Sequence, residues 1–136
     1  MKEVKPIFLV EDDDIDARRT RQSLEELHVA NPFVRATNGE EALAWLRNPA
    51  NPAPLIILLD LEMPIMNGLE FLAVAKADPQ LRRIPIVILT ASRSEADKIA
   101  SFDLSVAGYM LKPVDADQFV TILRMINIYW TLSETP

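Results

Sequence analysis

Five short apolar segments alternate along the chain with stretches in which apolar residues recur at the spacing of a helix. Three of these segments are continuous runs rich in branched side chains, bounded by proline, aspartate or threonine. Such runs are typical of strands that are buried on both faces of a sheet. The other two segments are weaker strand candidates. Strands are therefore predicted at residues 7–10, 33–36, 55–59, 86–89 and 107–111.

Helices are predicted between and after these strands. The alternation of strand and helix implies right-handed crossovers, and it predicts the α/β class: a doubly wound, five-stranded parallel sheet with five helices on its two faces. Five sequence features predict the five helices. They are a common face formed by Ala17, Thr20, Leu24 and Leu27, the segments 39–47 and 69–77 with helical spacing of apolar residues, a capping box from Ser92 to Glu95, and a similar reciprocal cap between Asp115 and Gln118.

The composition narrows the chemistry that the chain can perform. Its 136 residues predict one domain, and the absence of cysteine excludes disulfides, thiolate metal sites and cysteine catalysis. A single histidine, His28, is too few for a zinc site built from several imidazoles. A net charge of −6 argues against a general nucleic-acid or anionic-membrane surface. With no apolar stretch near the roughly 18 residues of a membrane span and no signal-peptide pattern, we expect a cytoplasmic protein without membrane or nucleic-acid partners.

Charged and polar residues follow four of the predicted strands, at the edge where a parallel sheet binds ligands. Glu11 and Asp12 follow the first strand, Asp60 the third, Thr90 the fourth and Lys112 the fifth. Any one of them could be a helix cap or a surface residue, but capping hardly explains all of them together. Two carboxylates about 5 Å apart repel by about 3 kcal/mol at an effective dielectric of about 20, so this cluster needs a cation. Oxygen ligands favour Mg²⁺ or Mn²⁺ over zinc.

Four motifs occur in order along the chain: Val10-Glu11-Asp12-Asp13, Asp60-Leu-Glu-Met-Pro-Ile-Met-Asn-Gly68, Thr90-Ala91 and Lys112-Pro113. Together they resemble the receiver domain of two-component response regulators over residues 4–127, nearly the whole chain. The resemblance implies a flavodoxin-like sheet with the strand order 2-1-3-4-5 and a cis peptide bond before Pro113. It also implies a receiver domain at residues 1–127, followed by a C-terminal extension at residues 128–136.

The resemblance further implies a role for each site residue. Asp60 would accept a phosphoryl group, and Lys112 and Thr90 would contact its oxygens. Tyr109 would change rotamer when Thr90 moves. The residues implied as the Mg²⁺ or Mn²⁺ site are Glu11, Asp12, Asp60 and Glu62, the last through its backbone carbonyl.

The function expected on these grounds is a signalling switch, a single-domain regulator without an output domain because the chain stops at Pro136. It would catalyse only its own phosphorylation and dephosphorylation. An aspartyl-phosphate phosphatase-type enzyme built on Asp60-Leu61-Glu62 is the alternative, although no acid/base aspartate two residues on and no cap region is evident. A nucleotide-binding module is a third, weakly supported alternative, since none of the three glycines lies in a phosphate-binding motif.

Two surfaces are expected to bind proteins. On the first predicted helix, Ile15, Arg19, Gln22 and Ser23 point away from the inner face, and receivers resemble one another in offering this face to a histidine kinase. Near the C-terminus, a second apolar patch adjoins the stripe that covers the sheet, which favours a homodimer. The ending resembles that of regulators associated with phytochrome kinases, so a phytochrome-type kinase is the expected partner. The expected dimer residues are Met125, Ile128, Tyr129, Trp130 and Leu132.

Overall fold

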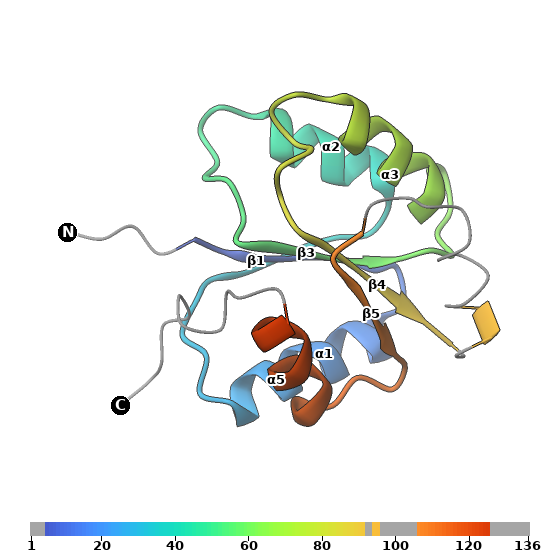
Figure 1. Cartoon of the computed structure of the whole chain (residues 1–136). Coiled ribbons are helices and arrows are strands. Elements are labelled where there is room, and N and C mark those ends of the chain that lie inside the picture. Colours follow the sequence, from blue (N-terminus) through green and yellow to red (C-terminus); the bar gives the residue numbers. More distant parts are fainter. Residues whose placement is uncertain (1–4, 92–93, 96–105, 126–136) are drawn as a thin grey trace.

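The computed structural model describes residues 5–91, 94–95 and 106–125. Its centre is a five-stranded parallel sheet in the order β2-β1-β3-β4-β5, as predicted (Figure 1). β3 and β4 each extend one residue beyond the apolar run that predicts them, so Asp60 and Thr90 are the last residues of their strands. The strands are β1 (Ile7–Val10), β2 (Phe33–Ala36), β3 (Ile56–Asp60), β4 (Ile86–Thr90) and β5 (Gly108–Leu111).

Four helices lie in the described residues: α1 (Asp14–Glu26), α2 (Gly39–Arg47), α3 (Gly68–Ala77) and α5 (Ala116–Met125). α2 and α3 cover one face of the sheet, and α1 and α5 cover the other (Figure 1). The predicted helix that opens at Ser92 lies largely outside the described residues, and only Ser94 and Glu95 of it are described. Among the helices that can be described, none is long and apolar enough to cross a membrane.

The two faces of the sheet build separate apolar layers. β1, β3 and β4 are buried along their whole length. Phe8 and Ile57 join the layer under α2 and α3, whereas their neighbours Leu9 and Leu58 join the layer under α1 and α5. The central strands are apolar at nearly every position because both of their faces are covered. This packed sheet is a rigid support for the side chains at its carboxyl edge.

Two helix starts show how local chemistry sets the path of the chain. At α1, the Asp13 side chain accepts a hydrogen bond from the Asp16 N–H at 2.9 Å. At α5, Asp115 accepts from the Gln118 N–H at 2.9 Å, as predicted. The prediction that the Gln118 side chain bonds back to the cap is wrong. This side chain instead pairs with the backbone N–H and C=O of Leu111, at 2.8 and 3.0 Å. This pair of bonds ties α5 to the end of β5.

Candidate functional site

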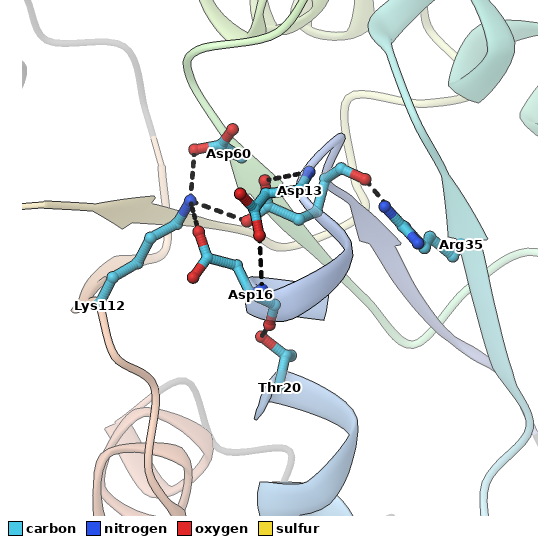
Figure 2. A network of polar contacts seen from close by, with 7 residues as sticks. Asp13, Asp16, Thr20, Arg35, Asp60 and Lys112 are labelled. Atoms are coloured by element: carbon cyan, nitrogen blue, oxygen red, sulfur yellow. Dashed lines mark hydrogen bonds and ion pairs between the residues drawn. The ribbon is translucent and has the colours of Figure 1, made fainter. Parts of the chain in front are cut away.

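The predicted charged residues converge at the carboxyl edge of the sheet around the ammonium of Lys112. Its Nζ lies 2.8 Å from Glu11 Oε1, 3.0 Å from Asp60 Oδ1 and 3.1 Å from Asp16 Oδ2. Figure 2 shows this ammonium between Asp60 and Asp16, with its bonds drawn as dashes. One cation from the end of β5 thus joins carboxylates supplied by β1, β3 and α1.

Burial dominates the electrostatics of this cluster. Glu11 has no exposed surface, and this burial, together with the charge of Asp60, raises the pKa of the Glu11 carboxyl to about 7 despite the ion pair with Lys112. Burial alone lowers the pKa of the Lys112 ammonium, but its contacts with Glu11 and Asp60 outweigh this effect and raise that pKa above its usual range. Lys112 therefore keeps its charge, and Glu11 takes up a proton near neutral pH when no other cation is nearby.

The same carboxylates offer ligands for a metal ion. One oxygen from each of Glu11, Asp12 and Asp60 lies within 4.8 Å of the other two. Glu11 and Asp60 are buried, whereas Asp12 is exposed at the mouth of the cluster. Carboxylates without full charge compensation at this spacing fit a divalent cation that prefers oxygen ligands, as Mg²⁺ and Mn²⁺ do.

Thr90 and Tyr109, the predicted switch pair, lie on neighbouring strands beside Lys112. Thr90 is buried, and its backbone carbonyl accepts a hydrogen bond from the Lys112 N–H at 2.8 Å. Tyr109 lies opposite Ile88 in the β4–β5 register and packs against the layer under α2 and α3. Its partial burial raises the pKa of its hydroxyl. The Lys112–Pro113 bond between β5 and α5 is cis, as the resemblance implied.

The loop after Asp60 passes close to the end of β3. Glu62 is exposed in this loop, at the position whose backbone carbonyl was predicted to reach the metal. The Gly68 N–H donates to the Leu61 carbonyl at 3.0 Å. A Cβ at Gly68 would lie 2.5 Å from the Asp60 carbonyl oxygen and 2.6 Å from the Leu61 Cα, so only glycine permits this approach.

Comparison with known proteins agrees with this geometry. A model of the response regulator receiver domain matches residues 7–124. The chain belongs to this family. It is similar to response regulator Rcp1 of Synechocystis sp., with 35% identity over 130 residues that cover 93% of this chain and 88% of Rcp1. Receivers are signalling proteins, so the match favours a switch over the phosphatase-type enzyme.

Two solved structures resemble the receiver closely. The structure of the bacteriophytochrome response regulator AtBRR superimposes with a TM-score of 0.89 at 38% identity, covering 95% of this chain and 96% of that one. The Mn(2+)-bound form of response regulator Rcp1 superimposes with a TM-score of 0.72 at 34% identity, covering 97% of this chain and 99% of that one. The fold and the order of its elements are therefore those of response regulators.

Asp16 is a member of the cluster that sequence reasoning missed. In the sequence it is one more acidic residue in the first turn of a helix, where negative charge is favoured by the helix dipole. The signal that could have found it is its place in the first turn of the helix that directly follows the acidic end of β1. In the receiver, its Oδ2 contacts the Lys112 ammonium.

Three of the four residues expected on the docking face of α1 are exposed. Ile15 is 60% exposed, and Arg19 and Gln22 are exposed as expected. The expectation for Ser23 is wrong, because this side chain is buried and its hydroxyl donates to the Val114 carbonyl at 3.1 Å. The inner face of α1 is wider than the apolar pattern indicates, since α1 packs against α5 and the segment that leads into it.

On α5, Phe119, Ile122 and Leu123 are buried in the layer under α1 and α5, as expected of the apolar stripe that covers the sheet. Met125, the first of the expected dimer residues, is 69% exposed. The other expected dimer residues, Ile128, Tyr129, Trp130 and Leu132, lie outside the described residues.

Proposed function

We propose that this receiver accepts a phosphoryl group on Asp60 and signals through a change of conformation at Thr90 and Tyr109. The observation that supports the acceptor most directly is the position of Asp60. It ends the central strand β3, is almost fully buried, and places Oδ1 at 3.0 Å from the Lys112 ammonium. A rigid strand end beside a fixed positive charge is a suitable place for an aspartyl nucleophile.

In the proposed step, a carboxylate oxygen of Asp60 forms a bond to phosphorus while the bond between phosphorus and the donor breaks. For a histidine kinase the donor is a phosphohistidine, and the P–N electron pair leaves with the imidazole. Lys112 contacts Asp60 before transfer and can then neutralise charge on the phosphoryl oxygens. Thr90 would donate a hydrogen bond from its hydroxyl to one of those oxygens, which would draw the Thr90 side chain toward Asp60 and vacate space for Tyr109.

Glu11, Asp12 and Asp60 are the residues that would hold Mg²⁺ or Mn²⁺, with a backbone carbonyl from Glu62. Their clustered oxygens support this assignment, and the related Rcp1 has been solved in a Mn(2+)-bound form. The ion, when bound, supplies positive charge that offsets the negative charge of the phosphoryl oxygens. Lys112 alone supplies one positive charge for the carboxylates that surround it.

Labelling with acetyl phosphate in the presence of Mg²⁺ tests the acceptor. Asp60→Asn is expected to abolish formation of a hydroxylamine-sensitive acyl phosphate, detected by intact mass. The matched control is Asp13→Asn, because Asp13 lies beside the cluster, is exposed, and can still cap α1 as asparagine. Labelling of Asp60→Asn to the wild-type level would refute the assignment. Rapid turnover of many phosphate esters would instead support the phosphatase-type alternative.

A histidine kinase of the phytochrome type is the proposed donor, and Ile15, Arg19 and Gln22 on α1 are its proposed docking residues. The similarity to bacteriophytochrome response regulators supports the kinase, and the exposure of these side chains supports the surface. Exchanging Ile15 and Arg19 should slow transfer from the cognate kinase without affecting acetyl-phosphate labelling. Glu26→Ala, an exposed change at the far end of α1, is the control. Equal loss of both reactions in the exchanged variant would contradict the docking role.

We also propose that residues 128–136 join two copies of the receiver domain at residues 1–127. Met125 supports this proposal, because it is a large apolar side chain that is exposed at the last residue of α5. Truncation after Asn127 should yield monomers that still phosphorylate on Asp60. Changing Ile128 and Tyr129 to polar residues should do the same. Light scattering that finds the full chain monomeric at tens of micromolar would refute the dimer.

A further inference from the structure

Arg35 on the edge strand β2 contacts the turn that carries two of the candidate metal ligands. Its Nε donates to the backbone carbonyl of Glu11 at 2.9 Å, and its Nη1 lies 2.8 Å from Asp14 Oδ1. Figure 2 shows the Arg35 guanidinium reaching the β1–α1 turn from the side away from Lys112. One planar group therefore spans the end of β1 and the first residue of α1.

These contacts complete the restraint of Glu11. Its N–H already donates to the Ala36 carbonyl of β2 at 2.9 Å, and Arg35 holds its carbonyl. With both backbone groups bonded to β2, the direction of the Glu11 side chain toward Lys112 is set by the main chain. The Asp13 cap then fixes the next part of the turn on α1.

The position of the guanidinium is unfavourable for one of its nitrogens. Its Nη2 is buried, and within the described part of the chain it has no hydrogen-bond partner. A buried donor without a partner is unfavourable, and an aliphatic residue at this point of β2 would avoid that cost. The bonds that Nε and Nη1 make to the β1–α1 turn explain why an arginine occupies this position.

We infer that Arg35 is a positioning residue for the binding of a divalent cation by Glu11 and Asp12. The inference rests on the proposed function, because it concerns the metal site of that reaction. Arg35 fixes the backbone from which both carboxylates project, so that their oxygens are already placed when the cation arrives. Outer-shell groups that orient ligands in this way typically change metal affinity by about 10-fold to 100-fold.

The sign of the effect separates positioning from simple electrostatics. A guanidinium near the cluster repels a cation, so if Arg35 acted only through its charge, its removal would tighten Mg²⁺ binding. Positioning predicts the opposite result, weaker binding in spite of the lost repulsion. A purely stabilising residue would lower the melting temperature and leave the affinity of the folded protein unchanged.

Calorimetric titration of the full chain with Mg²⁺ alone, and separately with Mn²⁺, tests the inference well below the melting temperature. Arg35→Ala is expected to weaken Mg²⁺ binding about 10-fold. Arg35→Lys keeps the charge but cannot make both contacts of the guanidinium, so it should also bind Mg²⁺ more weakly than the wild type does. Arg35→Gln, which can still donate to the Glu11 carbonyl, should lose less affinity than Arg35→Ala, and it serves as the second variant if alanine prevents folding.

Arg21→Ala is the matched control. Arg21 also joins α1 to β2, with its guanidinium 5.7 Å from the centre of the Phe33 ring, and it forms an ion pair with Glu25 rather than a bond to the β1–α1 turn. Its Mg²⁺ affinity should equal that of the wild type. Equal or tighter binding by Arg35→Ala would overturn the positioning role. If the wild type binds no Mg²⁺, the proposed metal site itself fails, which is a distinct result.

Discussion

The neighbouring strands β1 and β3 both deliver carboxylates to the same cluster, but the turns that follow them are held in different ways. After β1, side chains hold a short turn. Asp13 caps α1, Arg35 binds the Glu11 carbonyl, and the Glu11 carboxylate is paired with Lys112. The position of this turn therefore depends on side chains that titrate or carry charge.

After β3, the backbone holds a longer loop at residues 61–67. The Gly68 N–H closes it onto the Leu61 carbonyl, and the Met66 N–H donates to the Pro64 carbonyl at 2.7 Å. The latter bond closes a γ-turn centred on Ile65, whose φ of 66° is unusual for a branched residue. This loop depends mainly on steric fit and backbone conformation, although at its end the Glu70 side chain accepts a hydrogen bond from the Asn67 N–H at 3.2 Å in the capping box of α3.

We therefore expect different kinds of change to disturb the two turns that carry the candidate metal ligands. Charge and pH should alter the β1–α1 turn, whereas added or removed atoms near the backbone should alter the β3–α3 loop. A variant in one turn and its counterpart in the other can be compared directly, because both turns end in the same cluster.

The largest effect is expected from Gly68→Ala in the β3–α3 loop. The new Cβ would collide with backbone atoms of Asp60 and Leu61, which cannot move without displacing β3, so the free energy of unfolding should fall by about 3 kcal/mol. Gly39→Ala is the matched control, since Gly39 also follows a capping asparagine at a helix start and its Cβ would lie nearest the flexible Met66 side chain, at 2.7 Å, with the Met66 carbonyl oxygen farther off at 3.0 Å. Urea unfolding should show a clearly smaller loss for Gly39→Ala; equal losses would contradict the steric argument.

A smaller effect is expected from pH at the β1–α1 turn. In the folded, metal-free protein the pKa of Glu11 is about 7, above its usual 4.5, so the folded state binds more protons than the unfolded state between these values. Stability should therefore fall as pH rises from about 4.5 to about 7, by about 2–3 kcal/mol. Glu11→Gln should remove this loss, and Asp13→Asn should keep it. Urea unfolding without metal, repeated across this range, checks the slope; a rise in stability would contradict it.

Loss of the α1 cap should have a modest effect. Asp13→Ala removes the acceptor for the Asp16 N–H and should lower the melting temperature by roughly 3 °C. Asp13→Asn keeps an acceptor and should leave the melting temperature nearly unchanged. The hydrogen bond from the Asp16 backbone also lowers the pKa of Asp13, so the cap is ionised at neutral pH. Equal melting temperatures for Asp13→Ala and the wild type would show that the turn does not need the cap.

The smallest effect, of opposite sign, is expected at Ile65. Ile65→Gly should raise the free energy of unfolding by about 0.5 kcal/mol, because relief of the positive φ slightly outweighs the entropy that glycine adds to the unfolded chain. Ile65→Ala keeps the Cβ and the strain, and it should bring no gain. Since Ile65 is 75% exposed, neither change removes core packing. A loss of stability in Ile65→Gly would show that the strain of the positive φ is smaller than the entropy that glycine adds to the unfolded chain.

The apolar pattern by itself determined which segments form the central sheet. Continuous runs such as Ile7–Val10 are apolar at every position, and this pattern is favourable only where both faces of a strand are covered. Because parallel strands end at one edge, the residues after these runs also indicated a common site, and the structure brings Glu11, Asp60 and Lys112 together there. Strand order came from the four receiver motifs, since no local pattern encodes which strands are neighbours.

Only the tertiary structure decided the remaining partners of the site. Asp16 resembles an ordinary first-turn acid and Arg35 an ordinary strand residue, since each finds its role through groups far along the chain: Lys112 for Asp16, and the Glu11 carbonyl for Arg35. Ser23 was assigned to the wrong face for the same reason, because its burial depends on α5 and on the Val114 carbonyl. Hydrophobic periodicity indicates which residues of a segment pack against the nearest apolar layer. It contains no information about a polar atom that a distant segment brings within hydrogen-bond distance.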